Sequence, residues 1–133
     1  MKIYRKYALC IIRKNRLLVL EEVDNAFYLL PGGRPEGDEL PQQALCRELR
    51  EELGVKVEEE SLKRLGMFED AAAGDESAVV RIELYLGNYS GEPQPCAEVK
   101  RLIWFAPSDD AARLAPVTRN KILPELIKLG LLH

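Results

Sequence analysis

The sequence predicts an α/β fold in which a mixed β-sheet is covered by helices on both faces. Runs of β-branched and aliphatic residues occur before and after one central helix-forming segment, and a second amphipathic segment closes the chain. With 133 residues, 47% hydrophobic and 31% charged, the chain has the size and composition of one globular unit. We therefore expect a single domain spanning residues 1–133.

The first strands are predicted by hydrophobic runs separated by polar residues. Residues Tyr4 to Arg13 and Leu17 to Glu22 flank the polar Lys14-Asn15-Arg16, which indicates a hairpin. Tyr28 to Leu30 is predicted to form a short third strand. The stretch from Pro31 to Asp38 is rich in Gly and Pro, which break regular elements, and we expect it to be a loop.

A central helix is predicted from about Pro41 to Leu53. The segment contains strong helix formers, and its proline stands in the first turn, where no backbone N–H is needed. Gly54 follows at the position where helices commonly end in a left-handed residue. Both ends of the helix are therefore marked in the sequence.

The second half of the chain is predicted to contain three strands and one helix. Lys63 to Ala72 and Ala78 to Tyr89 have the composition of strands and are expected to pair as a hairpin. A further strand is expected around Leu102 to Phe105. Thr118 to Leu129 has the pattern of an amphipathic helix that packs one face on the sheet.

Charge and cysteine content exclude several functional classes. A net charge of −3 and a pI of about 5.3 argue against a general nucleic-acid binder. No apolar run approaches the roughly 20 residues of a membrane helix, and no signal-peptide pattern is present at the N-terminus. Cys10, Cys46 and Cys96 lie far apart, as expected for reduced thiols used in packing. We expect a cytoplasmic protein without a membrane or nucleic-acid partner.

One spaced motif is carried by the loop and the central helix. Between Gly33 and Val55 the sequence is G-x5-E-x7-R-E-L-x-E-E-L-G-V. The fixed positions are Gly33, Glu39, Arg47, Glu48, Leu49, Glu51, Glu52, Gly54 and Val55. This pattern resembles the signature of the Nudix hydrolase family at every fixed position, and it covers 23 of the 133 residues.

Helical geometry divides the motif into two faces. At 100° per residue, Leu45, Leu49 and Leu53 share one narrow arc, whereas the glutamates at 48, 51 and 52 gather on another side. Like charges at these spacings destabilise a helix by a few tenths of a kcal/mol each, about as much as a favourable pair stabilises it. Arg47, four residues before Glu51, offsets part of this repulsion, and a hard divalent cation would offset more.

An ordinary solvated face is the usual explanation of an isolated E-x-x-E-E pattern. Here a Gly-Gly turn precedes the helix, Glu39 stands near its start and Gly54 follows its end. A solvated face requires none of these residues. The combination therefore favours a metal site.

The family resemblance implies a Nudix-type α/β/α sandwich with a mixed β-sheet between helices. It implies a Mg²⁺-dependent pyrophosphohydrolase, with Mn²⁺ as a substitute, that cleaves the diphosphate linkage of a nucleoside diphosphate derivative. The implied metal-binding groups are the carbonyl of Gly32 and the side chains of Glu48, Glu51 and Glu52. Arg47 is expected to orient a neighbouring glutamate, and Glu39 to brace the loop that turns at Gly33. The number of metal ions is left open.

The general base is expected to be a carboxylate. The only histidine, His133, is the last residue and is expected to be a frayed terminus. By resemblance, the base is either Glu48 or an acidic residue in a later loop, for which we select Glu98. The competing residues are Glu69, Asp70, Asp75 and Glu76.

Three residues near the loop are candidates for contacts with the substrate. Phe27 and Tyr28 precede the loop and could stack on a base, and Arg34 could contact phosphates. Residues Asp70 to Ala73 contain neither the proline associated with ADP-ribose hydrolases nor the tyrosine associated with dinucleoside polyphosphate hydrolases. A nucleoside triphosphate, modified or not, or a nucleotide sugar remains as the expected small-molecule partner.

Two other functions are compatible with the same fold. Some proteins that resemble this family bind nucleotides or regulate partners without hydrolysis, but such proteins usually lack motif residues that this chain retains. The excess of acidic over basic residues argues against a pyrophosphohydrolase that acts on RNA 5′ ends. A homodimer is left open.

Overall fold

The strands form two main sheets in the computed structural model, which describes all residues from 1 to 133. The first sheet has the order β5 (Gly32–Gly33), β1 (Lys2–Leu9), β8 (Asp75–Leu86) and β7 (Lys63–Ala72). Strands β1 and β8 are parallel, while the β1–β5 and β7–β8 pairs are antiparallel. This sheet is therefore mixed, as expected.

The second sheet is antiparallel and is centred on β3 (Arg16–Glu22). Strand β3 pairs with β10 (Val99–Phe105) on one side and with β2 (Ile12–Arg13) and β4 (Tyr28–Leu29) on the other. Five consecutive residues of β3, from Leu17 to Glu21, are buried. This strand is therefore covered on both faces.

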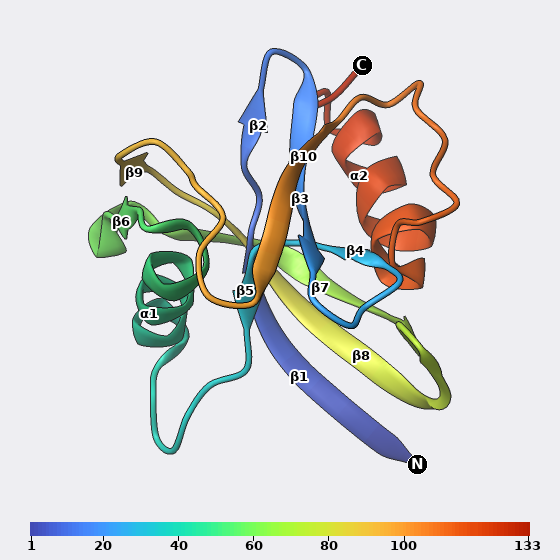
Figure 1. Cartoon of the computed structure of the whole chain (residues 1–133), viewed down its shortest axis with the longest axis horizontal. Helices are drawn as coiled ribbons and strands as arrows, with labels where there is room; N and C mark the ends of the chain where they lie inside the picture. Colours follow the sequence, from blue (N-terminus) through green and yellow to red (C-terminus); the bar gives the residue numbers. More distant parts are fainter.

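A small third sheet joins the segments that follow α1 and β8. It pairs β6 (Lys56–Val57) with β9 (Tyr89–Ser90), and the 3₁₀ turn η1 (Glu59–Ser61) follows β6. The N–H of Glu58 donates to the carbonyl of Asn88, which extends this pairing. The small sheet closes the end of the domain beside α1 (Figure 1).

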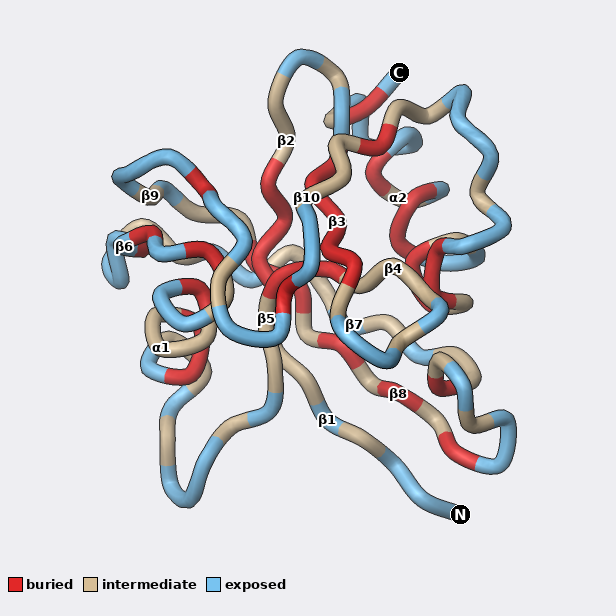
Figure 2. Tube along the Cα trace, viewed as in Figure 1, coloured by how far each residue is buried: buried red, intermediate tan, exposed pale blue.

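Helices cover the sheets from two sides, which confirms the predicted α/β architecture. Helix α1 (Pro41–Leu53) lies on one side of the strands and α2 (Leu123–Lys128) on the other (Figure 1). Each helix contributes to a separate hydrophobic cluster, α1 with Leu45, Leu49 and Leu53 and α2 with Leu123 and Leu126. The buried segments accordingly lie in the central strands and on the inner sides of the helices (Figure 2).

Helix α1 has the boundaries that its sequence predicts. Pro41 is its first residue, and Gly54 ends it in the left-handed conformation with φ +68°. Leu40 at the N-cap has no side-chain acceptor, so only half of a capping box is present: the N–H of Leu40 donates to Oε1 of Gln43 at 2.9 Å. Ala44, Leu45, Leu49 and Leu53 are fully buried, which anchors one face of the helix.

The predicted strand from Tyr4 to Arg13 is divided between the two sheets. Strand β1 ends at Leu9, and the chain enters the second sheet at Ile12. Between them, the N–H of Cys10 donates to the carbonyl of Tyr85 in β8, and the carbonyl of Ile11 accepts from Leu18 in β3. The chain therefore changes from one sheet to the other within a hydrophobic run that is continuous in the sequence.

The predicted hairpins are present with tight turns. Lys14 and Asn15 both have positive φ, 51° and 60°, as a two-residue turn between β2 and β3 requires. The β7–β8 turn contains Gly74 at φ +80°, and β8 begins at Asp75, three residues earlier than expected. Strand β10 likewise begins at Val99, three residues before the predicted Leu102.

The closing helical segment begins with a wide turn. Residues Thr118–Ile122 (η2) are π-helical, and the α-helix occupies only Leu123–Lys128. Pro124 has no N–H for the carbonyl of Asn120, and its ring would clash with that carbonyl in a regular α-helix. A wider turn before Pro124 relieves this clash, so the predicted amphipathic helix is interrupted rather than uniform.

The C-terminus is held in place, which corrects the expectation that His133 is frayed. The N–H of His133 donates to Oδ1 of Asn15 at 2.9 Å, and the amide of Asn15 donates to the carbonyl of His133. The chain end is therefore tied to the β2–β3 turn. None of the helices combines the length and the apolar character needed to cross a membrane.

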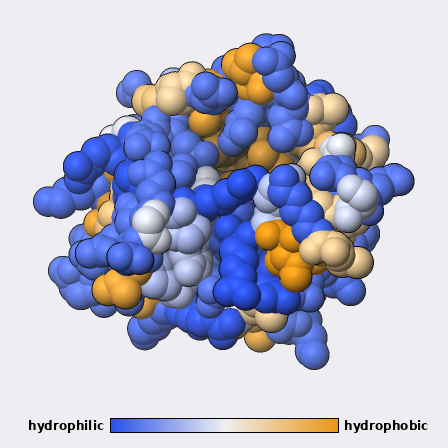
Figure 3. All heavy atoms as spheres, turned by 90° about the horizontal axis from the view of Figure 1, so that it is seen from below, coloured by the Kyte–Doolittle hydropathy of each residue, from blue (hydrophilic) through white to orange (hydrophobic).

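Hydrophobic residues are largely withdrawn from the surface. Seen from below, the molecule is mainly hydrophilic, and its hydrophobic atoms form separate patches (Figure 3). The interior clusters therefore contain most of the apolar material that stabilises the fold. Cys10 belongs to this interior, where burial raises the pKa of its thiol to about 12.

Substitution of Leu49 by Ala tests the packing of α1. Because Leu49 is fully buried in the cluster between α1 and the strands, we expect Leu49→Ala to lower the free energy of unfolding by about 2–5 kcal/mol. Leu40→Ala is the matched control, since Leu40 is 59% exposed and should cost less than about 1 kcal/mol. Urea denaturation of both variants measures the difference, and equal losses would contradict this packing.

Candidate active site

The Gly-Gly pair before the helix is a short strand held against β1. Gly32 and Gly33 form β5, which pairs with Ala8 and Tyr7. Gly32 has φ +143°, and a Cβ added to it would stand 2.0 Å from the carbonyl oxygen of Tyr7. Only glycine fits at position 32. Strand β5 can therefore approach the backbone of β1 this closely only because residue 32 has no side chain.

Gly33 makes room for a carboxylate of α1. A Cβ on Gly33 would lie 2.5 Å from Cδ of Glu48 and within 2.8 Å of both carboxylate oxygens. Gly32 contacts a second glutamate, because its N–H donates to Oε1 of Glu52 at 2.9 Å. The two glycines thus bring the loop backbone into contact with two glutamates of the motif.

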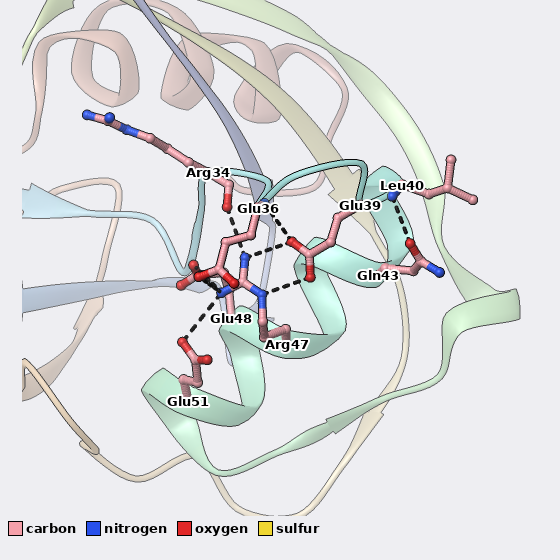
Figure 4. Close-up of polar contacts among 8 residues, drawn as sticks. All are labelled: Arg34, Glu36, Glu39, Leu40, Gln43, Arg47, Glu48 and Glu51. Carbon is pink, nitrogen blue, oxygen red and sulfur yellow. Dashed lines mark hydrogen bonds and ion pairs between the residues drawn. The ribbon is translucent and has the colours of Figure 1, made fainter.

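Arg47 connects the loop to the helix through several contacts (Figure 4). Its Nε and Nη2 donate to the two oxygens of Glu39 at 2.8 and 2.9 Å, which is a bidentate pair. Nη1 donates to Glu48 at 3.0 Å, and Nη2 also donates to the carbonyl of Arg34 at 3.0 Å. Glu36 and Glu51 lie 3.5 Å from Nη1.

These contacts stabilise the charged forms of the pair. The guanidinium of Arg47 and the N–H of Glu36 lower the pKa of Glu39 from 4.5 to about 2. The pKa of Arg47 is raised, first by its hydrogen bond to Glu39. Glu39 therefore binds the loop backbone and the helix together.

Glu48 and Glu52 are in a less favourable environment. Burial is the main cause that raises the pKa of Glu48, and the hydrogen bond from Arg47 opposes it. Burial also raises the pKa of Glu52, to about 8, with further contributions from the charges of Glu48 and Glu22. Only the N–H of Gly32 donates a hydrogen bond to the Glu52 carboxylate. Glu52 is thus a partly buried carboxyl group that no cationic side chain contacts, and its raised pKa favours the protonated form at neutral pH.

The chemistry of these groups fits a hard divalent cation. Carboxylate and carbonyl oxygens are the ligands that Mg²⁺ and Mn²⁺ prefer, and a cation beside Glu52 would offset the cost of its burial. No three His, Cys, Asp or Glu side chains are arranged around one point as a metal site requires. Arg47 holds Glu48 at 3.0 Å and lies 3.5 Å from Glu51, and the side chain of Glu51 is 55% exposed.

A cavity of about 260 Å³ opens beside the two glycines. Residues of both main sheets and the first residue of η2 line it, together with Gly32 and Gly33. Its polar and aromatic lining includes Tyr4, Lys6, Glu22, Asn25, Asp75 and Thr118. The cavity therefore adjoins the backbone that contacts Glu48 and Glu52.

Of the predicted substrate contacts, Arg34 lies at the cavity and the two aromatic residues do not line it. The guanidinium of Arg34 lies over the ring of Tyr4, 4.3 Å from the centroid, and its side chain points away from the Arg47 cluster (Figure 4). The hydroxyl of Tyr28 accepts a hydrogen bond from Arg113 at 2.8 Å, and its ring is stacked under the same guanidinium. Tyr4 and Tyr7 are the aromatic residues that line the cavity, and the sequence did not single out Tyr4 as a substrate contact.

Glu98 lies outside the cavity, in the turn before β10. Its side chain is exposed, and its carbonyl accepts from the N–H of Val23 at 2.9 Å. Its charge acts on Glu22, the last residue of β3, whose pKa is raised chiefly by burial. The structure thus brings Glu98 near Glu22 and does not bring it to the Gly32–Gly33 turn.

Several cavity residues carried no signal in the sequence. Lys6 and Glu22 stand in ordinary strand patterns, Asn25 lies in the loop between β3 and β4, and Thr118 is the first residue of η2. Their proximity arises from the pairing of β1 with β5 and β8 and from the placement of η2. A polar residue that ends an otherwise hydrophobic strand, as Glu22 does, was the one available indication.

Comparison with known proteins agrees with the resemblance in the loop and helix. The sequence profile described as "NUDIX domain" matches residues 3–126. Over 115 residues, 86% of this chain and 71% of the relative, the chain is 30% identical to a MutT-like protein of Streptomyces ambofaciens. A stretch of 31 residues, 23% of this chain and 28% of the relative, is 55% identical to an 8-oxo-dGTP diphosphatase of Proteus vulgaris.

Solved structures show the same similarity at the level of the fold. The MutT NUDIX hydrolase of Burkholderia pseudomallei superposes with a TM-score of 0.74 and 29% sequence identity, covering 94% of this chain and 98% of that chain. The fold is therefore shared over nearly the full length of both proteins.

The pH dependence of stability tests the Glu39–Arg47 pair. Because the pKa of Glu39 is lowered from 4.5 to about 2, its ionised form stabilises the fold above its ordinary pKa, and this contribution disappears as the pH falls through about 2. We expect Glu39→Gln to be less stable than the unmodified protein at neutral pH, with a difference that shrinks as the pH falls from about 4.5 towards 2.

Urea denaturation at a series of pH values measures this difference. Asp38→Asn removes an exposed neighbouring charge that makes no hydrogen bond and should leave stability nearly unchanged throughout. A difference for Glu39→Gln that stays constant across the acid range would show that the pair does not act as described.

Alanine substitutions at three glycines distinguish a position that packs against backbone, a position that packs against a side chain and a position that packs against neither. Gly32→Ala places Cβ against backbone and should destabilise by about 3 kcal/mol or more. Gly33→Ala meets only the end of the Glu48 side chain and should cost about 1–3 kcal/mol while displacing that carboxylate. Gly37→Ala, with φ +54° and open space, should cost about 1–2 kcal/mol. Thermal and urea unfolding rank them, and a Gly32 variant no less stable than the Gly37 variant would refute the close approach.

Proposed function

The chain belongs to the NUDIX domain family, and on this premise we propose that it is a Mg²⁺-dependent pyrophosphohydrolase of a nucleoside diphosphate derivative. Its substrate is a nucleoside triphosphate, modified or not, or a nucleotide sugar. The observation that carries the proposal is a cavity that adjoins a turn whose backbone binds Glu52 and packs on Glu48.

The metal-binding residues we propose are those of the motif. Glu48, Glu51 and Glu52, with the carbonyl of Gly32, supply the oxygen ligands, and Mn²⁺ can replace Mg²⁺. When bound, the metal neutralises phosphoryl oxygens and polarises a water molecule. The partly buried carboxyl group of Glu52, which no cationic side chain contacts, is the feature of the chain that supports this assignment.

Arg47 prepares the glutamates for this role without contacting the cavity. Its bond to Glu48 fixes the orientation of that carboxylate against Gly33, and its bidentate bond to Glu39 fixes the loop. Burial raises the pKa of Glu48, which makes its carboxylate a better proton acceptor near neutral pH. Glu48 is thus our choice for the base that accepts a proton from the attacking water.

Cationic side chains at the cavity support the binding of phosphates. Arg34 and Lys6 both line it, close to the two glycines. Guanidinium and ammonium groups bind phosphate oxygens by charge-assisted hydrogen bonds. We propose that they hold the diphosphate beside the motif glutamates.

The remaining cavity suits a nucleoside. Tyr4 offers an aromatic face, and Asn25, Asp75 and Thr118 offer donors and acceptors for a base or sugar. The 8-oxo-dGTP diphosphatase among the relatives supports a modified nucleoside triphosphate, although that match spans only 31 residues. The three unpaired cysteines suit the reducing cytoplasm in which such nucleotides occur.

The alternative is a nucleotide-binding module of the same family without hydrolytic activity. Retention of Glu48, Glu51 and Glu52, together with the glycines they contact, favours the enzyme. Turnover distinguishes the two directly, since a binding module would be stabilised by a nucleotide without converting it.

A substrate panel with and without metal tests the proposal. We expect release of phosphate or pyrophosphate from at least one nucleoside triphosphate or nucleotide sugar in Mg²⁺, and no release in excess chelator. Glu52→Gln should lower kcat at least about a hundredfold, since metal-based charge stabilisation contributes several kcal/mol. Glu58→Gln, an exposed charge beyond the helix, should stay within about twofold. Stabilisation by nucleotide with no turnover on the whole panel would favour the binding module.

A further inference from the structure

Glu21 is the only charged residue that is buried, and the proposed reaction does not use it. It lies on β3 between Arg101 of β10 and Tyr28 of β4, which are its partners in the two neighbouring strands. Arg101 and Arg113 each form an ion pair with one of its carboxylate oxygens. The hydrogen bond from Arg101 lowers the pKa of Glu21, burial opposes this effect, and the hydrogen bond from Arg113 lowers the pKa further. Glu21 is therefore an ionised group that binds arginines from two separate segments.

Arg113 connects Glu21 to the segment that follows β10. Its Nη2 donates to Oε2 of Glu21 at 3.1 Å, its Nη1 to the hydroxyl of Tyr28 at 2.8 Å and its Nε to the carbonyl of Ala26 at 3.2 Å. The guanidinium also lies 4.3 Å from the centroid of the Tyr28 ring. All three nitrogens of one rigid, planar group are in use, so Arg113 is fixed relative to both β3 and β4.

The backbone on either side of Leu114 pairs with β4. The N–H of Tyr28 donates to the carbonyl of Arg113 at 2.7 Å, and the N–H of Ala115 donates to the carbonyl of Tyr28 at 3.1 Å. Tyr28 and Leu114 accordingly form a parallel bridge. The residues that follow this bridge on the two segments form one wall of the cavity: Leu29, Leu30, Ala115, Val117 and Thr118.

Burial of Leu114 does not by itself fix this wall. Leu114 is fully buried, but hydrophobic contact is non-directional and tolerates small displacements of the segment. Hydrogen bonds weaken steeply when they are misaligned, so those of Arg113 restrict the segment to one position on β4. Arg113 itself does not line the cavity. It therefore acts on the cavity only through the wall that follows it in the chain.

We propose that Arg113 is a positioning residue: anchored to Glu21, it holds the wall of the cavity in the conformation that receives the nucleoside part of the substrate. The inference rests on the proposed function, in which the diphosphate lies beside the α1 motif and the nucleoside fills the rest of the cavity. Without Arg113 the substrate has to order the wall, so its affinity falls by the fraction of molecules in which the wall is formed. The chemical step is unaffected, because the motif glutamates lie on α1.

Steady-state kinetics in Mg²⁺ test the assignment with the nucleoside triphosphate that the unmodified protein hydrolyses fastest. We expect Arg113→Ala to raise KM about tenfold and to leave kcat within about twofold, as for the loss of binding that ground state and transition state share. Arg101→Ala is the matched control. Arg101 donates to the same two side chains, those of Glu21 and Tyr28, but it belongs to β10. Its removal should leave KM within about twofold.

A purely structural role of Arg113 would give a different result. Loss of stability reduces the folded fraction of the enzyme, which lowers the apparent kcat and leaves KM unchanged. That result for Arg113→Ala would overturn the inference. An equal rise of KM in Arg113→Ala and Arg101→Ala would also overturn it, because the effect would then belong to Glu21 and not to the wall.

Hydrogen exchange measured by NMR tests the wall without any substrate. The amides of Tyr28 and Ala115 bond across the pairing of the two segments. In Arg113→Ala we expect both to exchange at least about tenfold faster relative to the amide of Leu49 in α1, because the pairing opens locally. In Arg101→Ala this ratio should not change. Equal acceleration of all three amides in Arg113→Ala would indicate a global loss of stability and would contradict the local role.

The outcomes distinguish this inference from the function on which it rests. If the unmodified protein binds a nucleotide without hydrolysing it, the proposed reaction fails, and the Kd for that nucleotide, measured by calorimetry, replaces KM in the comparison of the two variants. If the unmodified protein hydrolyses nucleotides and the Tyr28 and Ala115 amides exchange normally in Arg113→Ala, only the role of Arg113 is overturned. If no nucleotide binds, both fail.

Discussion

A single guanidinium organises the charged surface of α1. Arg47 is in bidentate contact with Glu39, donates to Glu48 and to the carbonyl of Arg34, and lies within 3.5 Å of Glu36 and Glu51. No residue of the loop between β5 and α1 belongs to either hydrophobic cluster, so these polar contacts hold the loop in place. A lysine could not replace them, because a point charge lacks the planar fork that meets two oxygens of one carboxylate and a carbonyl at once.

The same residue divides the glutamates into two groups. Those that Arg47 contacts are partly neutralised and hold the loop, whereas Glu52 does not contact Arg47 and accepts a hydrogen bond from the N–H of Gly32. The motif glutamate without a cationic partner is therefore the one that is bound to the backbone of the Gly32–Gly33 turn. Because Gly33 has no Cβ, the carboxylate of Glu48, which Arg47 contacts, also packs against the Gly32–Gly33 turn to which Glu52 is bound. Glu39, which lies in the loop before α1, thus serves stability, whereas we propose that the chemistry belongs to glutamates of the helix itself.

Sequence alone predicted the parts of this arrangement that are local. The boundaries of α1 follow from Pro41 and Gly54, whereas the role of Glu39 was expected only from the family resemblance. The cavity was not predictable, because Tyr4, Lys6, Glu22 and Thr118 are brought together only by strand pairing and by the wide turn before Pro124. For the same reason the break in the first strand at Cys10 is invisible in a continuous hydrophobic run: it reflects a change of partner, which no local preference encodes.

The position of the cavity has a consequence for specificity. Its floor and walls come from strands of both sheets and from η2, whereas α1 contributes no lining residue. The groups that we propose for binding a base or sugar are therefore on elements that can change without disturbing the Arg47 cluster, because that cluster is tied only to the loop and the helix.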